Sequence, residues 1–431
     1  MEKTVLPGAL SGTLAVLPSK SASHRAVMMA AMAQGTTQIA PLQLSRDIQA
    51  TLSCAKALGM MEEADISPME GSPFVCARIR GGVRVQGSAP LRTLDCGESG
   101  STLRFFIPLA LDGRGPVRFV GHGRLMQRPL SVYERLFVPR GIAWRPEGDA
   151  LTVGGRLESG AYALPGDVSS QFITGLLLAL AGLPGDSEIA MTTPLESRAY
   201  VELTRQAQAA FGVVSRWTED GRTLCIPGGQ VPRSPGALHV EGDWSHAAFY
   251  LTAGAIGGAE PVSLTGLCEE SAQGDRAIVR ILREMGADIR WEQGCVTARP
   301  SSLHGVCVDA SQVPDLVPVL AVAMAAAQGE SRITGAARLR IKESDRLSAI
   351  CRALAAAGAD VSEQPDGLIV RGGRGLHGAR IDGCNDHRIV MAMAVAGTVA
   401  DGGLTICGAE AVEKSAPAFW AEFASLGGRT R

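Results

Sequence analysis

The sequence has neither the long apolar runs that cross a membrane nor the excess of basic residues that binds nucleic acid. Its longest apolar runs, near residues 172–183 and 389–400, extend over about a dozen residues, too few to span a bilayer. Lysine and arginine number 41 against 43 aspartates and glutamates, so the formal net charge is −2. This balance argues against a nucleic-acid-binding surface and against an acidic tether.

Cysteines with metal-binding spacing are also lacking. The ten cysteines are scattered without a C-x-x-C pair or a combined His/Cys pattern, which is typical of reduced thiols in a cytosol. Glu2 and Lys3 begin the chain without the apolar core of a secretion signal. We therefore expect a cytoplasmic protein that needs no metal and no cofactor, long enough for two or three domains.

A nucleotide-binding loop is absent as well. Residues 373–378 match G-x-G-x-x-G and follow a strand-like segment, but residues 379–383 have the pattern of another strand and a turn. A dinucleotide-binding fingerprint must open a helix, so this match fails, and no Walker lysine motif occurs.

What the sequence does have is a repeated helix start. In residues 164–182 a polar turn, in which Asp167, Ser169 and Ser170 can accept backbone hydrogen bonds, precedes an almost wholly apolar helix. Such a helix is predicted to be buried. Its N-terminus is either an ordinary cap of a core helix or an anion site, because free N–H groups and the helix dipole both favour negative charge.

Similar starts recur roughly every 70–75 residues, a period that indicates repeated supersecondary units. The other five lie at residues 18–25, 97–104, 241–246, 312–315 and 384–388. A second, amphipathic helix in each unit ends near Gly59, Gly141, Gly212, Gly286, Gly358 or Gly427. Short strands, such as residues 150–153, 262–264, 368–370 and 404–406, fill the gaps. Six units exceed one core, so we predict an α/β protein with two lobes of three units each.

Several local predictions accompany this scheme. Residues 4–17 are expected to form a strand, and the Pro/Gly/Ser-rich residues 233–236 to cross between lobes. Ser197 is expected to cap the helix that ends at Gly212. Residues 271–286 are predicted to form a charged surface helix without chemistry, and residues 413–415 to open the last surface helix.

Cations gather where the units begin. They are Lys20, Arg25, Arg104, Arg128, Lys342, Arg346, Arg388 and Lys414. Cations oppose the dipole at a helix start, unless a bound anion offsets them. The alternatives are a solvated face around Lys20 and Arg25, and a salt-bridged solvent face for residues 338–346. If the starts converge, they favour a positive site for small phosphorylated and carboxylated molecules.

Asp315 is the one carboxylate at the start of its predicted buried helix. Two interpretations remain open: it caps the helix, or burial raises its pKa toward that of a working base.

The motifs at and after these helix starts form an ordered set. They are Pro18-Ser19-Lys20-Ser21-x-Ser23-x-Arg25, Gly97-x-Ser99-Gly100-Ser101-x-x-Arg104, Arg128-Pro129, Ser169-Ser170-Gln171, Ser197-x-x-Tyr200, Pro314-Asp315, Lys342-Glu343-Ser344-Asp345-Arg346 and Asp386-His387-Arg388. Together, in order and at family-like spacing from about residue 14 to residue 414, they resemble the 5-enolpyruvylshikimate-3-phosphate synthases.

The resemblance implies two lobes of three βαβαββ units, a pair of inside-out α/β barrels. Residues 15–238 would form the first lobe, on the shikimate 3-phosphate side. Residues 1–14 and 239–431 would form the second, on the side of the base and phosphoenolpyruvate. The implied active site is a cleft between lobes that closes on both substrates. The implied reaction belongs to the shikimate pathway, which leads to chorismate and the aromatic amino acids.

The resemblance also implies roles for individual residues. Shikimate 3-phosphate would be bound by Lys20, Ser21, Arg25, Ser169, Ser170, Gln171, Ser197, Asp315 and Lys342. Phosphoenolpyruvate would be bound by Lys20, Gly100, Arg128, Gln171, Arg346, Arg388 and Lys414. Asp315 would accept the proton of the 5-hydroxyl, and Glu343, with or without Lys20, would protonate the methylene carbon.

Three positions depart from the family pattern: Glu98, where asparagine is common, His24 and His246. One alternative is UDP-N-acetylglucosamine enolpyruvyltransferase, but that family has a cysteine before its Arg-Pro motif and residues 121–128 have none. The other is a catalytically inactive anion-binding protein on the same scaffold, which would not need Asp315 and Glu343 as a matched base and acid. The protein is expected to be a monomer.

Overall fold

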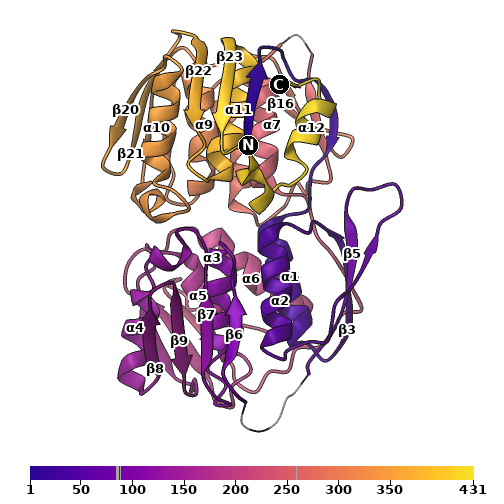
Figure 1. The fold of residues 1–431 in the computed structure, drawn as a ribbon, viewed down its shortest axis with the longest axis vertical. Helices are drawn as coiled ribbons and strands as arrows, with labels where there is room; N and C mark the ends of the chain where they lie inside the picture. Colours follow the sequence, from indigo (N-terminus) through magenta and orange to yellow (C-terminus); the bar gives the residue numbers. More distant parts are fainter. Residues whose placement is uncertain (84–86, 88, 259) are drawn as a thin grey trace. The chain divides into compact units, whose positions relative to one another are not determined.

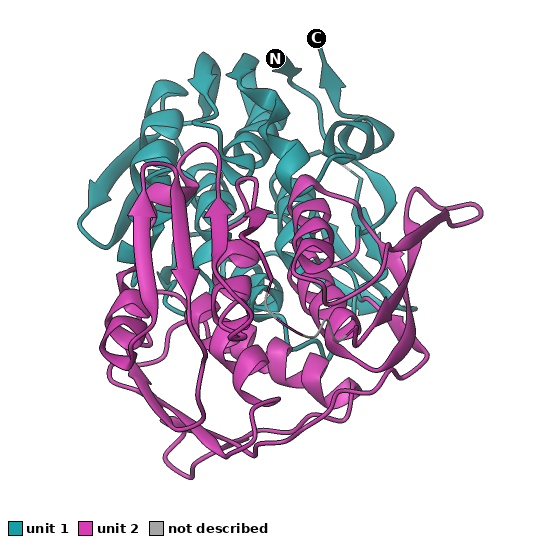
Figure 2. Ribbon diagram, turned by 60° about the horizontal axis from the view of Figure 1, so that its bottom comes forward, with its two compact units in different colours: residues 1–17, 241–431 teal, residues 18–240 magenta. Residues whose placement is uncertain are grey.

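The chain folds into two compact units, drawn in Figure 2. Unit 1 comprises residues 1–17 and 241–431, and unit 2 comprises residues 18–240. The computed structural model describes residues 1–83, 87, 89–258 and 260–431. The unit boundaries follow Leu17 and Val240, whereas the sequence-based boundaries follow residues 14 and 238.

The described residues form six four-stranded sheets. In unit 2 their strand orders are β14(Ala237–His239)-β3(Gly35–Leu42)-β5(Val75–Gly81)-β4(Asp65–Pro68), β6(Arg92–Asp95)-β7(Val117–Val120)-β9(Ala150–Gly154)-β8(Ala143–Glu147) and β10(Ala161–Leu164)-β11(Ser187–Met191)-β13(Thr223–Ile226)-β12(Arg216–Trp217). In unit 1 they are β16(Asp288–Glu292)-β17(Cys295–Arg299)-β15(Val262–Thr265)-β2(Gly12–Ala15), β18(Cys307–Asp309)-β19(Gly329–Thr334)-β21(Gly367–Gly372)-β20(Asp360–Gln364) and β22(Leu376–Asp382)-β23(Ala400–Cys407)-β1(Glu2–Leu6)-β24(Arg429–Thr430).

A parallel pair followed by antiparallel strands is the common pattern of these sheets. The β10 and β11 strands, for example, are parallel, and β13 pairs antiparallel with both β11 and β12. A helix connects each parallel pair where the chain is continuous, which is the βαβ arrangement. The predicted α/β fold of six βαβαββ-like units is confirmed.

Two sheets are completed by the start of the chain. The β2 strand pairs in parallel with β15, where Leu14 lies opposite Leu264. The β1 strand lies between β23 and β24, antiparallel to both. The expected strand at residues 4–17 is thus two strands, which separate where Gly8 adopts a φ of +154°.

Twelve α-helices occur in the described residues, two for each unit of the repeat as predicted. The first of each pair are α1(Lys20–Met32), α3(Gly100–Leu109), α5(Ser170–Leu180), α7(Trp244–Ile256), α9(Val317–Ala326) and α11(His387–Val399), all largely buried. The second are α2(Arg46–Ala57), α4(Ser131–Phe137), α6(Arg198–Ala210), α8(Ala277–Glu284), α10(Arg346–Ala356) and α12(Phe419–Ser425). Figure 1 shows α7, α9 and α11 side by side within unit 1, where each contacts the other two.

Most buried helices begin at a side-chain cap, as their polar starts predict. Ser99 Oγ accepts from the N–H of Thr102 at 3.2 Å, and Asp243 Oδ1 accepts from that of His246 at 2.9 Å. These bonds satisfy donors that a helix leaves free in its first turn. The α9 helix differs, because the 3₁₀-helix η4(Pro314–Leu316) leads into it without a side-chain cap.

Three local predictions are wrong. The surface helix expected from residue 271 begins only at η3(Gly274–Arg276), since Ser271 Oγ accepts from the N–H of Gln273 and forms a turn. Residues 413 and 414 end the 3₁₀-helix η6(Ala409–Lys414), and the last surface helix opens at Phe419. Ser197 precedes α6 but makes no side-chain cap, because its φ is +52°.

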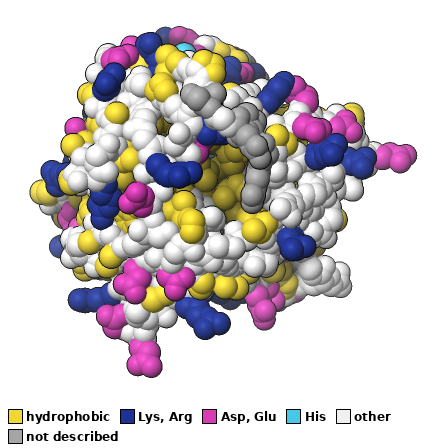
Figure 3. Space-filling model, turned by 90° about the horizontal axis from the view of Figure 1, so that it is seen from below, with side chains coloured by type: hydrophobic (Ala, Val, Ile, Leu, Met, Phe, Trp, Pro, Cys, Tyr) yellow, Lys and Arg dark blue, Asp and Glu magenta, His cyan; other side chains and the backbone are white. Residues whose placement is uncertain are grey.

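Other predictions hold. The β22 strand, and no helix, follows the G-x-G-x-x-G match. No helix in the described part of the chain is both long and apolar enough to cross a membrane. Basic and acidic side chains are interspersed on the face drawn in Figure 3, as the balanced composition predicts.

Close packing in unit 2 requires a glycine where α5 meets α3. A Cβ on Gly175 would lie 2.2 Å from Tyr133 Oη and 2.4 Å from the carbonyl oxygen of Arg104. Tyr133 Oη itself lies 2.9 Å from the carbonyl oxygens of Arg104 and Phe172. This phenol therefore bridges the two helices in a space that no further atom fits.

Gly175→Ala should consequently lower the free energy of unfolding by about 1–3 kcal/mol, because the added methyl displaces the Tyr133 bridge. Urea unfolding measures the change. Gly182→Ala is the matched control, since a Cβ there has its nearest neighbour 4.0 Å away. Equal stability of the two variants would contradict this account of the packing.

Candidate active site

In unit 2, Arg25 lies on the buried helix α1 and is only 3 % exposed. Its Nε donates to Thr204 Oγ1 at 2.8 Å, and its two Nη atoms donate to the carbonyl oxygens of Ser21 and Tyr200, each at 2.8 Å. Burial lowers the pKa of the guanidinium to about 10, so it remains charged at neutral pH. All its hydrogen-bond partners among the described residues are neutral, which leaves a positive potential at this place.

A second buried guanidinium, that of Arg104 on α3, lies beside α5. Its Nη1 donates to Gln171 Oε1 at 2.7 Å, and Gln171 Nε2 donates to Ser101 Oγ at 3.0 Å. Burial and then the positive charge of Arg128 lower the pKa of Arg104 to about 9. Two like charges are therefore held close together, which is favourable only with a negative charge near them.

Gly100 makes room for these two arginines. A Cβ at this position would lie 2.9 Å from Arg128 Nη1 and 3.0 Å from Arg104 Nη1. The structure thus brings together the predicted residues Gly100, Arg128 and Gln171 at the start of α3 and α5.

The remaining predicted residues of unit 2 lie at helix starts. Lys20 is the first residue of α1, and its Nζ lies 3.0 Å from Asp47 Oδ2 on α2. Ser21 follows it. Ser169 caps α5 by accepting from the N–H of Gln171 at 3.3 Å, and Ser170 is buried as the first residue of that helix.

In unit 1, Arg346 is the first residue of α10 and is 2 % exposed. Its Nε lies 2.7 Å from Asp386 Oδ2, its Nη1 lies 2.8 Å from Asp315 Oδ1, and its Nη2 lies 3.6 Å from Glu343 Oε1. Burial alone would lower the pKa of Arg346, but these carboxylates outweigh it and raise the pKa. The alternative of a salt-bridged solvent face at residues 338–346 therefore does not hold for Arg346, whereas Arg340, which pairs with Glu363 at 2.6 Å, fits it.

Asp315 is held by two guanidinium groups. Besides Arg346, Arg388 contacts it: Nη2 lies 3.2 Å from Asp315 Oδ2, and Nη1 donates to its backbone carbonyl at 3.2 Å. Asp315 lies within η4 and does not cap α9. The capping interpretation is wrong, and the carboxylate is fixed in position by charge.

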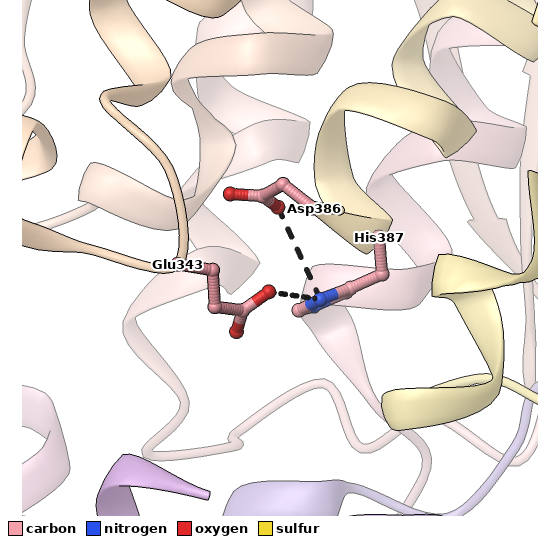
Figure 4. A group of neighbouring side chains, drawn as sticks. All are labelled: Glu343, Asp386 and His387. Carbon is pink, nitrogen blue, oxygen red and sulfur yellow. Dashed lines mark hydrogen bonds and ion pairs between the residues drawn. The ribbon is translucent and has the colours of Figure 1, made fainter. Parts of the chain in front are cut away.

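Glu343, Asp386 and His387 point toward one another in Figure 4. Glu343 Oε2 lies 2.8 Å from His387 Nδ1, and Asp386 Oδ1 lies 4.0 Å from the same nitrogen. Nearby, Lys414 is 4 % exposed, and its Nζ donates to the carbonyl oxygen of Asn385 at 2.7 Å. Lys342 is half-buried and directly follows the 3₁₀-helix η5(Ala337–Ile341).

Comparison with known proteins identifies the family to which this chain belongs. The family model of EPSP synthase (3-phosphoshikimate 1-carboxyvinyltransferase) matches residues 6–423. The 3-phosphoshikimate 1-carboxyvinyltransferase of Clostridium kluyveri is 42 % identical over 430 residues, covering 99 % of this chain and 97 % of that protein. That of Clostridioides difficile is 39 % identical, with coverage of 99 % and 97 %. The chain belongs to the EPSP synthase family.

Solved structures agree with this membership. EPSP synthase from Acinetobacter baumannii superposes with a TM-score of 0.80 at 28 % identity, covering 100 % of this chain and 99 % of that one. The enolpyruvyl transferase NikO from Streptomyces tendae, at 17 % identity and a TM-score of 0.76, covers 100 % and 98 % and shares the fold. The resemblance to EPSP synthases inferred from the sequence is confirmed.

The three residues that depart from the EPSP synthase pattern, His24, His246 and Glu98, each lie against identifiable groups. His24 Nδ1 lies 2.8 Å from Thr51 Oγ1, and burial, with the charges of Lys20 and Arg25, holds the pKa of His24 well below its usual value. It is therefore neutral. His246 Nε2 lies 2.6 Å from Glu422 Oε2 in unit 1. Glu98 extends toward Gly123, where a Cβ would lie 2.6 Å from its Oε2.

Sequence reasoning missed the contacts of three carboxylates. Asp47 pairs with Lys20, Asp386 pairs with Arg346, and Asp275 is buried in η3. Asp386 lies in one of the motifs identified from the sequence, but no local pattern indicates that it pairs with Arg346 as well as capping its own helix. Asp47 and Asp275 lie in segments that look like ordinary surface helices and turns.

Asp386→Asn should lower the free energy of unfolding by about 3–5 kcal/mol at neutral pH, because it leaves Arg346 buried with one partner fewer. Asparagine is also a good N-cap, so the bond to the N–H of Arg388 can survive. Asp401→Asn, at an exposed position on β23, is the control.

The difference between wild type and Asp386→Asn should depend on pH. Burial would raise the pKa of Asp386, but Arg346 outweighs burial and lowers the pKa below the ordinary 3.8. The stabilisation is therefore complete above about pH 4 and is lost as the pH falls through the lower folded-state value. Urea unfolding between about pH 7 and pH 3 measures this; a difference that grows on acidification would refute the sign.

Proposed function

We propose that this chain transfers the enolpyruvyl group of phosphoenolpyruvate to the 5-hydroxyl of shikimate 3-phosphate and releases inorganic phosphate. The main structural support is the contrast between two clusters. Unit 2 holds Arg25 and Arg104 with neutral partners, whereas unit 1 holds Asp315 between two guanidinium groups with Glu343 nearby. The first cluster suits anions, and the second suits proton transfer.

We assign shikimate 3-phosphate mainly to unit 2. In this assignment the hydroxyls of Ser169, Ser170 and Ser197 and the helix start of α5 bind its phosphate. The other groups that bind it are Lys20, Ser21, Arg25, Gln171, Asp315 and Lys342. The left-handed backbone of Ser197 supports its part, because non-glycine residues in that conformation cluster at active sites and ligand-binding sites.

Phosphoenolpyruvate is assigned to guanidinium and ammonium groups of both units. They are Lys20, Arg128, Arg346, Arg388 and Lys414, with Gln171 and the backbone at Gly100. Phosphate and carboxylate oxygens match the forked donors of arginine. Because Gly100 has no side chain, the guanidinium groups of Arg104 and Arg128 can lie beside it and reach an anion there.

The reaction then proceeds by addition and elimination. The ionised Asp315 accepts the proton of the 5-hydroxyl as its oxygen attacks C2 of phosphoenolpyruvate. Glu343, in its acid form and with or without Lys20, donates a proton to the methylene carbon. The tetrahedral adduct then returns a proton from the resulting methyl group to the group that supplied it and expels phosphate, which re-forms the carbon–carbon double bond as an enol ether. The protein contributes positioning and preorganised charge.

Phosphate release from phosphoenolpyruvate tests the proposal. It should require shikimate 3-phosphate and should not occur with UDP-N-acetylglucosamine as the acceptor. Release only with the nucleotide sugar would assign the chain to the related transferase. A folded protein that binds phosphate but releases none with either acceptor would favour an inactive binding protein.

Asp315→Ala should lower kcat by two or more orders of magnitude (~10²–10⁴), because the hydroxyl loses its proton acceptor. Binding of shikimate 3-phosphate, measured by calorimetry, should persist. Asp401→Ala, in the same unit and exposed, should retain wild-type kcat. Unchanged turnover of Asp315→Ala would reject Asp315 as the base.

The cytoplasmic location and the monomeric state stay predictions. The assignment of residues 18–240 to the shikimate 3-phosphate side and of unit 1 to the base is part of this proposal.

A further inference from the structure

A second carboxylate of unit 1, that of Asp275, is buried and has no part in the reaction proposed above. Asp275 lies in η3 and is 3 % exposed. Ser245 Oγ, in the first turn of α7, donates to its Oδ2. Its Oδ1 is buried and has no hydrogen-bond partner in the described part of the chain. A carboxylate buried with one oxygen unpaired is costly to the fold.

Three charged residues and one hydroxyl, from three elements, influence the ionisation of Asp275. Asp243 and Ser245 belong to the start of α7, Asp315 to η4 and Arg388 to α11. Burial first, and then the negative charge of Asp315, raise the pKa of Asp275 to about 7, while Arg388 opposes this change. Ser245, which donates to Asp275, lines a small cavity together with Arg388, and Arg388 in turn contacts Asp315. The charge that Asp275 gains as the pH rises through neutrality therefore acts on a guanidinium that holds Asp315.

The charge of Asp275 can offset the effect of the two guanidinium groups on the basicity of Asp315. Arg346 and Arg388 hold Asp315 in place, but each positive charge also stabilises its ionised form and weakens it as a base. A nearby negative charge has the opposite effect, because two like charges destabilise each other. A base that is both firmly held and sufficiently basic needs such a counterweight.

We propose that Asp275 is a positioning residue whose negative charge, held by Ser245, offsets Arg346 and Arg388 and keeps Asp315 basic. The inference rests on the proposed role of Asp315 as the base. A purely structural role is less suited to the geometry, since an asparagine could accept from Ser245 without the cost of a buried charge.

The test compares kcat of wild type and Asp275→Asn between about pH 5.5 and 9, with phosphate release in the presence of shikimate 3-phosphate as the readout. Below about pH 6 wild-type Asp275 is protonated, so the two proteins should be nearly equal. Above pH 7 it is ionised, and the ratio of wild-type to variant kcat should rise to about tenfold. Both KM values should change by less than about twofold.

The ratio isolates Asp275, because histidines and substrate phosphate titrate in both proteins. Ser245→Ala removes the hydrogen bond that favours the ionised form, so its fall from wild-type kcat should be largest near neutral pH and shrink at higher pH. Asp288→Asn is the matched control: Asp288 is a partly exposed carboxylate of unit 1 that pairs with Arg290 at 2.8 Å, and the ratio of wild-type to variant kcat should stay near one.

A ratio for Asp275→Asn that stays constant with pH would overturn the proposal, as would a loss of thermal stability with unchanged kcat. A wild-type protein without phosphate release in the presence of shikimate 3-phosphate would instead overturn the proposed function, and the role of Asp275 with it. An active wild type with a flat ratio rejects only Asp275.

Discussion

The buried guanidinium of Arg346 determines the arrangement of charge in unit 1. A charge with 2 % exposure is tolerated only where opposite charges and hydrogen bonds replace water. Its partners Asp315 and Asp386 come from η4 and the cap of α11, while Arg346 itself begins α10. One buried guanidinium therefore links the starts of α9, α10 and α11, which belong to two successive repeats. Neither Asp315 nor Asp386 can move without leaving a buried charge with one partner fewer.

The same repeat produces the opposite electrostatics in unit 2. Arg25 and Arg104 are as deeply enclosed as Arg346, but hydroxyls, an amide and backbone carbonyls take the place of carboxylates. Neutral partners satisfy the donors without cancelling the charge, and helix starts add to the positive potential. Burial lowers the pKa of Arg104 without abolishing its charge, so an anion is the natural complement. The two units thus share a fold and differ in the charge that they leave uncompensated.

The sequence allowed the helices, the repeat and most of the cationic starts to be predicted, because caps, apolar runs and glycine stops are local signals. The features that could not be predicted depend on backbone conformation and on contacts between residues far apart in the sequence. The positive φ of Ser197 replaced the expected cap, and Ser271 formed a turn that delayed its helix. The pairing of Asp386 with Arg346 joins residues 40 apart, a separation at which no local pattern operates. Asp275 was missed for the same reason, since its neighbours are distant in the sequence.

The buried helices differ between their bodies, which are fixed by packing, and their first residues, which carry polar and charged side chains. This difference lets the same fold hold different charges in the two units. The bodies of α5 and α3 are fixed by packing as tight as that at Gly175, where a Cβ would lie 2.2 Å from Tyr133 Oη. The first turns, in contrast, are joined by polar contacts, such as the hydrogen bond from Gln171 Nε2 on α5 to Ser101 Oγ on α3. Gly100 combines the two features, because it is the first residue of α3 and is also constrained by close packing. Its missing side chain lets two guanidinium groups approach the start of the helix. Apolar packing therefore constrains the helix bodies, whereas charge pairing and hydrogen bonding constrain their first residues.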